Sequence, residues 1–156
     1  MQLEEIIKAI QPLDETAMQA ARARQDTLTK PRGSLGRLEE LSVQLAGMKA
    51  ALFPSVERKA VIVMAADHGV AREGVSAYPP EVTAQMVLNF LRGGAAINVL
   101  ARQAGARVSV VDIGVAVEFE PLPGLIRRKV MCGTRDLSKG PAMTRAEAEQ
   151  ALQVGI

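Results

Sequence analysis

Two aspartates in this sequence occupy positions that suit ligand binding. Asp67-His68-Gly69 and Asp112-Ile113-Gly114 each follow a run of apolar residues. A carboxylate can accept hydrogen bonds from sugar hydroxyls or a heterocycle N–H, and a glycine lets the backbone approach a ligand closely. The alternative is structural, because an aspartate in this position often caps the next turn or helix. The sequence leaves both interpretations open for each aspartate.

His68 and Cys132 are the only residues of their types. A metal site needs several such ligands, so no metal is expected. A Ser-His-Asp triad is not expected either, because no serine stands in a G-x-S-x-G turn. We therefore expect His68 to shape its loop by hydrogen bonding. A lone cysteine at a strand end is usually a small buried hydrophobe, and it indicates a reducing compartment.

Glycines at two places could offer backbone N–H groups to a phosphate. Gly93-Gly94 precedes a predicted helix, and Gly33 and Gly36 belong to one short loop. Neither place carries a Walker A loop or a G-x-G-x-x-G motif, and no cofactor is predicted. For the Gly33 loop an ordinary turn is the favoured interpretation, because no strand precedes it.

The elements that must hold these residues change in kind near Lys59. Before it, helical spacing of apolar residues predicts helices over residues 3–10, about 14–28 and about 38–47. After it, the runs 60–66 and 108–113 predict strands buried on both faces, and 126–131 suggests a third. Helices are predicted over 81–91 and 95–103, and a capping box of Thr144 and Glu147 opens a last helix.

Strands separated by helices predict the α/β class, with a Rossmann-like parallel sheet, flanking helices and a preceding N-terminal helical region. Residues 1–52 form the helical region, which is part of a small domain, and residues 53–156 form a partial α/β Rossmann-like domain. In open sheets of this class ligands bind beyond the carboxyl ends of the strands. Asp67 and Asp112 stand at such ends.

Composition excludes several classes of partner. The net charge is +2, aromatic residues make up 3%, and Tyr78 is the only tyrosine, so nucleic acid is not an expected partner. No apolar run approaches the roughly 18–20 residues needed to cross a membrane. The acidic start, Met1 to Glu5, lacks the apolar core of a signal peptide. A cytoplasmic protein is predicted.

One stretch of ten residues is distinctive: Lys30-Pro31-Arg32-Gly33-Ser34-Leu35-Gly36-Arg37-Leu38-Glu39. Further segments are Leu41–Met48, Ala66–Val70, Glu73–Pro79, Val82–Met86, Gln103–Ala106, Val111–Gly114 and Gly140–Thr144. Together, and in this order, they resemble the nicotinate-nucleotide:dimethylbenzimidazole phosphoribosyltransferase family. Each piece is weak alone, but the combination is specific and spans nearly the whole chain.

The resemblance implies transfer of phosphoribose from nicotinate mononucleotide to 5,6-dimethylbenzimidazole. The products are α-ribazole 5′-phosphate and nicotinate, in the lower-ligand branch of cobalamin biosynthesis. It also implies a Rossmann-like fold, a helical small domain and a homodimer that acts on small molecules.

The family's base pocket lies around the loop and helix after the first strand, which here contain Tyr78, Pro79, Gln85 and Met86. An aromatic ring beside a methionine suits a flat apolar base, and ordinary helix packing is an equal alternative for Met86. The predicted substrate-binding set is Asp67, His68, Gly69, Tyr78, Pro79, Gln85, Met86 and Asp112.

Family members are considerably longer than 156 residues, which bears on catalysis. Their nucleotide-phosphate loop and their general base, a glutamate, lie beyond the region that corresponds to this chain. No catalytic residue is therefore predicted here, and we expect the chain alone to be a catalytically impaired part of the enzyme. Two alternatives stay open. One is a non-catalytic module that binds a benzimidazole or a protein, and the other is a structural half-domain with a separately encoded second half.

Overall fold

The computed structural model describes residues 3–156, which form two units, residues 3–57 and residues 58–156. Along the chain, the boundary between the units falls between Glu57 and Arg58. The sequence analysis predicts a domain boundary between residues 52 and 53. Each unit has its own buried core of hydrophobic side chains. The two units are therefore described separately.

The smaller unit consists of helices. They are α1 (Leu3–Ala9), α2 (Glu15–Asp26) and α3 (Arg37–Lys49). Helix α2 begins where the sequence predicts, because the Asp14 side chain accepts a 2.7 Å hydrogen bond from the backbone N–H of Ala17. Ala17 and Ala21 of α2 pack against Val43 and Ala46 of α3 to form the core of this unit. Small side chains on both helices allow this close packing.

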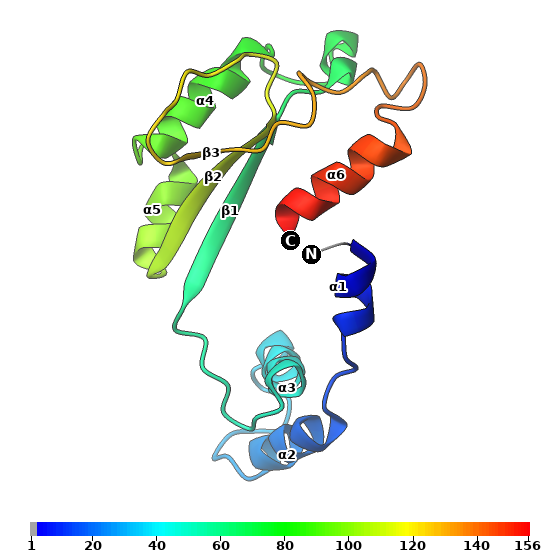
Figure 1. Cartoon of the computed structure of the whole chain (residues 1–156). Helices are drawn as coiled ribbons and strands as arrows, with labels where there is room; N and C mark the ends of the chain where they lie inside the picture. Colours follow the sequence, from blue (N-terminus) through cyan, green and yellow to red (C-terminus); the bar gives the residue numbers. More distant parts are fainter. Residues whose placement is uncertain (1–2) are drawn as a thin grey trace. The chain divides into compact units, whose positions relative to one another are not determined.

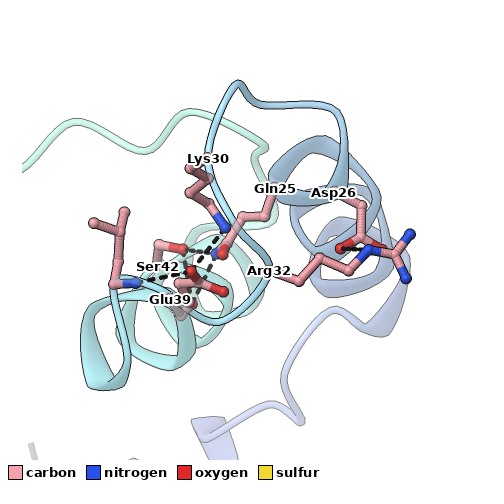
Figure 2. Close-up of polar contacts among 7 residues, drawn as sticks. Gln25, Asp26, Lys30, Arg32, Glu39 and Ser42 are labelled. Carbon is pink, nitrogen blue, oxygen red and sulfur yellow. Dashed lines mark hydrogen bonds and ion pairs between the residues drawn. The ribbon is translucent and has the colours of Figure 1, made fainter.

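The loop between α2 and α3 is held by Glu39, as Figure 2 shows. The Glu39 carboxylate accepts hydrogen bonds from Lys30 Nζ at 2.7 Å and from the backbone N–H of Leu35 at 3.1 Å. The bond from Lys30 is the main cause that lowers the pKa of Glu39. Gln25 adds a bond from its Nε2 to the Glu39 carbonyl at 2.9 Å. The first seven residues of the distinctive stretch therefore form a loop, which is held by Glu39 in the first turn of α3.

The larger unit contains a parallel sheet in the order β1-β2-β3 (Figure 1). Its strands are β1 (Lys59–Ala66), β2 (Ala106–Gly114) and β3 (Leu125–Arg127). Its helices are the 3₁₀ helix η1 (Gly69–Glu73), α4 (Glu81–Leu91), α5 (Ala96–Gln103) and α6 (Arg145–Gly155). Helices α4 and α5 connect β1 to β2. The structure confirms the predicted Rossmann-like parallel sheet with flanking helices.

The core of the larger unit lies between the sheet and α4. Ala65 of β1, Val110 of β2 and Val87 of α4 are buried together with Val115 and Phe119, which follow β2. Val87 and Val115 are wholly buried. The residues just beyond the end of β2 thus belong to the core, which fixes their backbone.

Two details of the sheet differ from the sequence predictions. Strand β1 is not buried on both faces, since Ile62 is 56% and Met64 is 42% exposed within the described residues. The core residues contact the opposite face of β1, which carries Ala65. Strand β3 ends at Arg127 instead of continuing to residue 131, because its pairing with β2 shifts there. The Arg128 N–H still donates in register to the Asp112 carbonyl at 2.9 Å, but the Val130 N–H donates to the Ile113 carbonyl at 3.0 Å, one residue out of register.

The last helix starts at the predicted capping box. Thr144 Oγ1 accepts from the backbone N–H of Glu147 at 3.2 Å, and Glu147 Oε2 accepts from the backbone N–H of Thr144 at 2.6 Å. Helix α6 then runs from Arg145 to Gly155. Across residues 3–156, none of the helices has the length and apolar character required to span a membrane.

Candidate binding cleft at the strand ends

A cleft of about 510 Å³ lies where β1 ends and α4 begins. Five residues of the predicted substrate-binding set line it, and they come from the end of β1, the following loop and α4. They are Asp67, His68, Tyr78, Pro79 and Met86. Tyr78 is 71% exposed, so its ring is accessible to a ligand. The cleft is consistent with the base-binding role proposed for these residues, which remains a prediction.

The other three predicted residues do not line this cleft. Gln85 is exposed on α4, and Gly69 borders a different hollow near Cys132. Asp112 is only 1% exposed and lies beneath the loop that follows β2. A direct contact between any of these residues and a ligand in the cleft is therefore not supported by their positions.

Further residues, most of them apolar, complete the wall of the cleft and were not in the predicted set. Val63 comes from β1, Val75 from the loop after η1, and Thr83 and Phe90 from α4. Helical spacing already placed Val82, Met86 and Phe90 on one face of α4 in the sequence. Spacing alone does not show that this face of α4 lines a cleft.

The Asp67 carboxylate is anchored on one side. Its Oδ2 accepts a 2.8 Å hydrogen bond from the backbone N–H of Ala116, in the loop after β2. Its backbone is held as well, because its N–H donates to the Gly114 carbonyl at 3.0 Å and its carbonyl accepts from Thr134 N–H at 2.9 Å. Asp67 therefore holds the loop after β2 in place, and it also lines the cleft.

Asp112 is held in the capping role that the sequence left open. Its Oδ1 accepts a 2.9 Å hydrogen bond from the backbone N–H of Val115. Its Oδ2 faces Lys129 Nζ at 3.4 Å, and Lys129 also donates to the carbonyls of Val115 at 2.8 Å and Val117 at 2.7 Å. Lys129 was not among the predicted site residues. Because Arg127 and Arg128 precede it in the predicted strand, the sequence carries no signal that singles out Lys129.

A third loop, residues 132–136, is joined to the strand ends. His68 Nδ1 lies 3.2 Å from Thr134 Oγ1, so His68 shapes its loop by hydrogen bonding, as predicted. Gly69 donates its N–H to the Thr134 carbonyl at 3.0 Å. A Cβ atom at Gly69 would lie 2.7 Å from the backbone N of Asp136, so only glycine fits. The glycine of the Asp67-His68-Gly69 motif therefore serves close backbone packing.

Cys132 is exposed, which corrects the prediction of a buried thiol. It lies in a loop beyond β3, where its Sγ donates to Glu118 Oε1 at 3.4 Å instead of joining the core. The hydrogen bond to Glu118 raises the pKa of the Cys132 thiol. The same bond, together with the Lys129 ammonium, lowers the pKa of Glu118.

The glycine loops that could cradle a phosphate have their N–H groups already bonded. Gly93 N–H donates to the Phe90 carbonyl and Gly94 N–H to the Asn89 carbonyl. In the other loop, Ser34 N–H bonds to the Pro31 carbonyl and Gly36 N–H to the Gly33 carbonyl. Both loops are turns in this structure. Among residues 3–156 there is also no group of three or more His, Cys, Asp and Glu side chains placed to hold a metal ion.

A second cleft of about 590 Å³ lies in the smaller unit, and its walls are strongly charged. Two of its lining cations are already paired, Arg22 with Glu15 at 2.8 Å and Arg37 with Glu40. A flat apolar ligand would gain little there, because it would cover charged groups without hydrogen-bonding them. The cleft at the end of β1 is therefore the candidate functional site.

A family profile described as Phosphoribosyltransferase matches residues 10–156. Because the match covers most of the chain, the chain belongs to this phosphoribosyltransferase family. The resemblance noted from the sequence motifs is thereby confirmed, and it agrees with the α/β architecture of the larger unit.

Individual relatives carry a more specific name, nicotinate-nucleotide–dimethylbenzimidazole phosphoribosyltransferase. One from Roseiflexus sp. strain RS-1 is 64% identical over 154 residues, which are 99% of this chain and 44% of that protein. One from Chloroflexus aurantiacus is 65% identical over 150 residues, or 96% of this chain and 43% of that protein. A crystal structure of the enzyme of this name from Thermus thermophilus is 55% identical, with a TM-score of 0.84. It covers 92% of this chain and 43% of the other. The chain thus spans less than half the length of these relatives.

Proposed function

We propose that this chain supplies the base-binding cleft of an enzyme that transfers phosphoribose from nicotinate mononucleotide to 5,6-dimethylbenzimidazole. The reaction would give α-ribazole 5′-phosphate and nicotinate, in the lower-ligand branch of cobalamin biosynthesis. Family membership supports the reaction class, and the name of the relatives supports the substrates. A cytoplasmic homodimer belongs to the same proposal and rests on the resemblance.

The observation that carries the proposal is the apolar cleft at the end of β1. Tyr78, Met86 and Phe90 line it, and its volume of about 510 Å³ is large enough for a bicyclic base. Aromatic rings and a thioether pack well on the faces of a flat apolar heterocycle. Asp67 is the only acidic side chain among the lining residues described, and it would orient a ligand through a hydrogen bond.

Asp67 is proposed to bind rather than to act as the general base. One of its oxygens already accepts a hydrogen bond from the Ala116 N–H, which fixes the orientation of the carboxyl group. The general base would come from the part of the relatives' length that this chain does not span. We therefore expect the chain alone to bind dimethylbenzimidazole but to show little or no turnover.

Binding is tested with two matched substitutions of exposed aromatic residues. Tyr78→Ala removes a ring from the cleft, whereas Phe53→Ala removes one that is 75% exposed in the smaller unit. We expect Tyr78→Ala to weaken the Kd for dimethylbenzimidazole by about tenfold, the effect of roughly 1.4 kcal/mol of lost stacking and burial. Isothermal titration of the purified chain measures both. Equal affinity of the two variants would contradict the assignment of the cleft.

Turnover is tested separately. The purified chain is incubated with nicotinate mononucleotide and dimethylbenzimidazole, and α-ribazole 5′-phosphate is measured by mass spectrometry beside a full-length relative. We expect product from the relative and none above the enzyme-free blank from this chain. Product from the chain would refute the claim that the general base lies outside this chain. It would then direct attention to Asp67, Glu73 and Glu81 as candidate general bases.

A further inference from the structure

The side chain of Lys129 is surrounded by oxygen atoms. Its Nζ lies 2.8 Å and 2.7 Å from the carbonyl oxygens of Val115 and Val117, 3.4 Å from Asp112 Oδ2 and 3.2 Å from Glu118 Oε1. Only 15% of the side chain is exposed. An ammonium has three donors and no acceptor, so this cage satisfies it fully. All four partners lie at the end of β2 or in the loop that follows it.

One of these bonds connects Lys129 to the cleft through a single peptide group. The Val115 carbonyl, which accepts from Lys129, and the Ala116 N–H, which donates to Asp67 Oδ2 at 2.8 Å, belong to the same planar unit. A cation therefore lies at the oxygen end of this peptide dipole and an anion at its N–H end. Hydrogen bonds in such a chain polarise and strengthen one another.

We propose that Lys129 is a positioning residue for the cleft. By holding the peptide between Val115 and Ala116, it sets the orientation of the Asp67 carboxylate that a bound heterocyclic or ribosyl ligand meets. Lys129 itself lies outside the lining of the cleft. The inference rests on the proposed function in so far as dimethylbenzimidazole is taken as the ligand.

The test compares Lys129→Met with Lys129→Arg and with Lys139→Met. Lys139 is a lysine of the nearby loop whose acidic partners are Glu73 and Asp136, so its removal is a matched control. We expect Lys129→Met to weaken dimethylbenzimidazole binding by about fivefold, a size typical of coupled contacts. Lys129→Arg should restore most of the affinity, and Lys139→Met should leave it unchanged. Equal Kd values for Lys129→Met and the control would overturn the proposal.

A double-mutant cycle separates positioning from general weakening of the fold. If Lys129 acts through Asp67, Lys129→Met should add less than about twofold to the Kd of an Asp67→Asn variant. Fully additive effects on binding would overturn the proposal. Should Lys129→Met fail to fold because Asp112 is left as an unpaired buried charge, the double variant Lys129→Met/Asp112→Asn replaces it. Wild-type affinity in that folded double variant would also overturn it.

Hydrogen exchange of the Ala116 amide distinguishes failure of this inference from failure of the proposed function. Its N–H should be protected in the wild type and lose protection in Lys129→Met, with or without ligand. If the wild type does not bind dimethylbenzimidazole, the proposed function fails, while a protected amide that depends on Lys129 still supports the peptide bridge. An Ala116 amide that exchanges equally in both proteins would overturn the inference even if the base binds.

Discussion

At the scale of single residues, Glu118 lies between a thiol and an ammonium. Its Oε1 accepts from Cys132 Sγ at 3.4 Å and lies 3.2 Å from Lys129 Nζ. A carboxylate that accepts from a thiol favours the protonated thiol, so the Cys132 pKa is raised even though the residue is exposed. Exposure alone would suggest a reactive cysteine, but reactivity requires the thiolate.

This leads to a prediction about alkylation of Cys132. Glu118→Ala removes the acceptor and leaves Lys129 nearby, so the Cys132 pKa should fall and the rate of reaction with iodoacetamide near pH 8 should rise. Glu120→Ala, an exposed acid two positions along the same loop, is the control. Mass spectrometry of the alkylated chain gives both rates. A slower reaction of Glu118→Ala than of the control would show that Glu118 does not suppress the thiolate.

At the scale of secondary structure, the start of α6 depends on a charge. Glu147 accepts from the backbone N–H of Thr144 and from Arg135, and these bonds, with the backbone bond first, lower its pKa from the ordinary value of 4.5. A carboxylate whose pKa is lower in the folded state stabilises it above the unfolded pKa. That stabilisation is lost as the pH falls through the folded pKa.

We therefore predict that Glu147→Gln flattens the acid side of the stability curve. Glutamine retains an oxygen that can accept from Thr144, but it carries no charge to be titrated. Below about pH 4.5 the melting temperature of the wild type should fall more steeply than that of the variant. Glu149→Gln, which removes a negative charge paired with Arg145 on the same helix, is the control. Parallel curves for Glu147→Gln and the wild type would contradict the role given to the capping box.

At the scale of the larger unit, burial differs sharply between the two faces of β1. Ala65 belongs to the core with Val87, whereas Ile62 is 56% exposed on the described structure. Hydrophobic side chains stabilise a fold in proportion to the apolar area that they remove from water. A substitution in the core that covers one face of β1 should therefore destabilise the fold far more than a substitution on the other face.

We predict that Val87→Ala lowers the free energy of unfolding by about 2 kcal/mol, the cost of a buried cavity. Ile62→Thr, on the exposed face, should change it by less than about 0.5 kcal/mol, as for other surface substitutions. Urea unfolding of the purified chain measures both. A loss of stability for Ile62→Thr as large as that for Val87→Ala would mean that the exposed face of β1 is covered in solution.

The sequence by itself determined the order of the α-helices and strands and several of their ends, although it did not predict η1 or the end of β3. The apolar runs predicted parallel strands, and Asp14 and Thr144 marked the starts of α2 and α6 because capping depends on residues only three apart. The distinctive motifs also indicated the family from the sequence alone. Such local signals need no knowledge of the fold.

Only the tertiary structure decided how the candidate site is assembled. Which predicted residues line the cleft depended on how α4 packs against β1, so Met86 faces it and Gln85 does not. The bridge from Lys129 to Asp67 joins three segments that are distant in sequence, and no spacing rule predicts it. Contacts of this kind form because parallel pairing brings the carboxyl ends of the strands to one edge, where the loops must satisfy one another's polar groups.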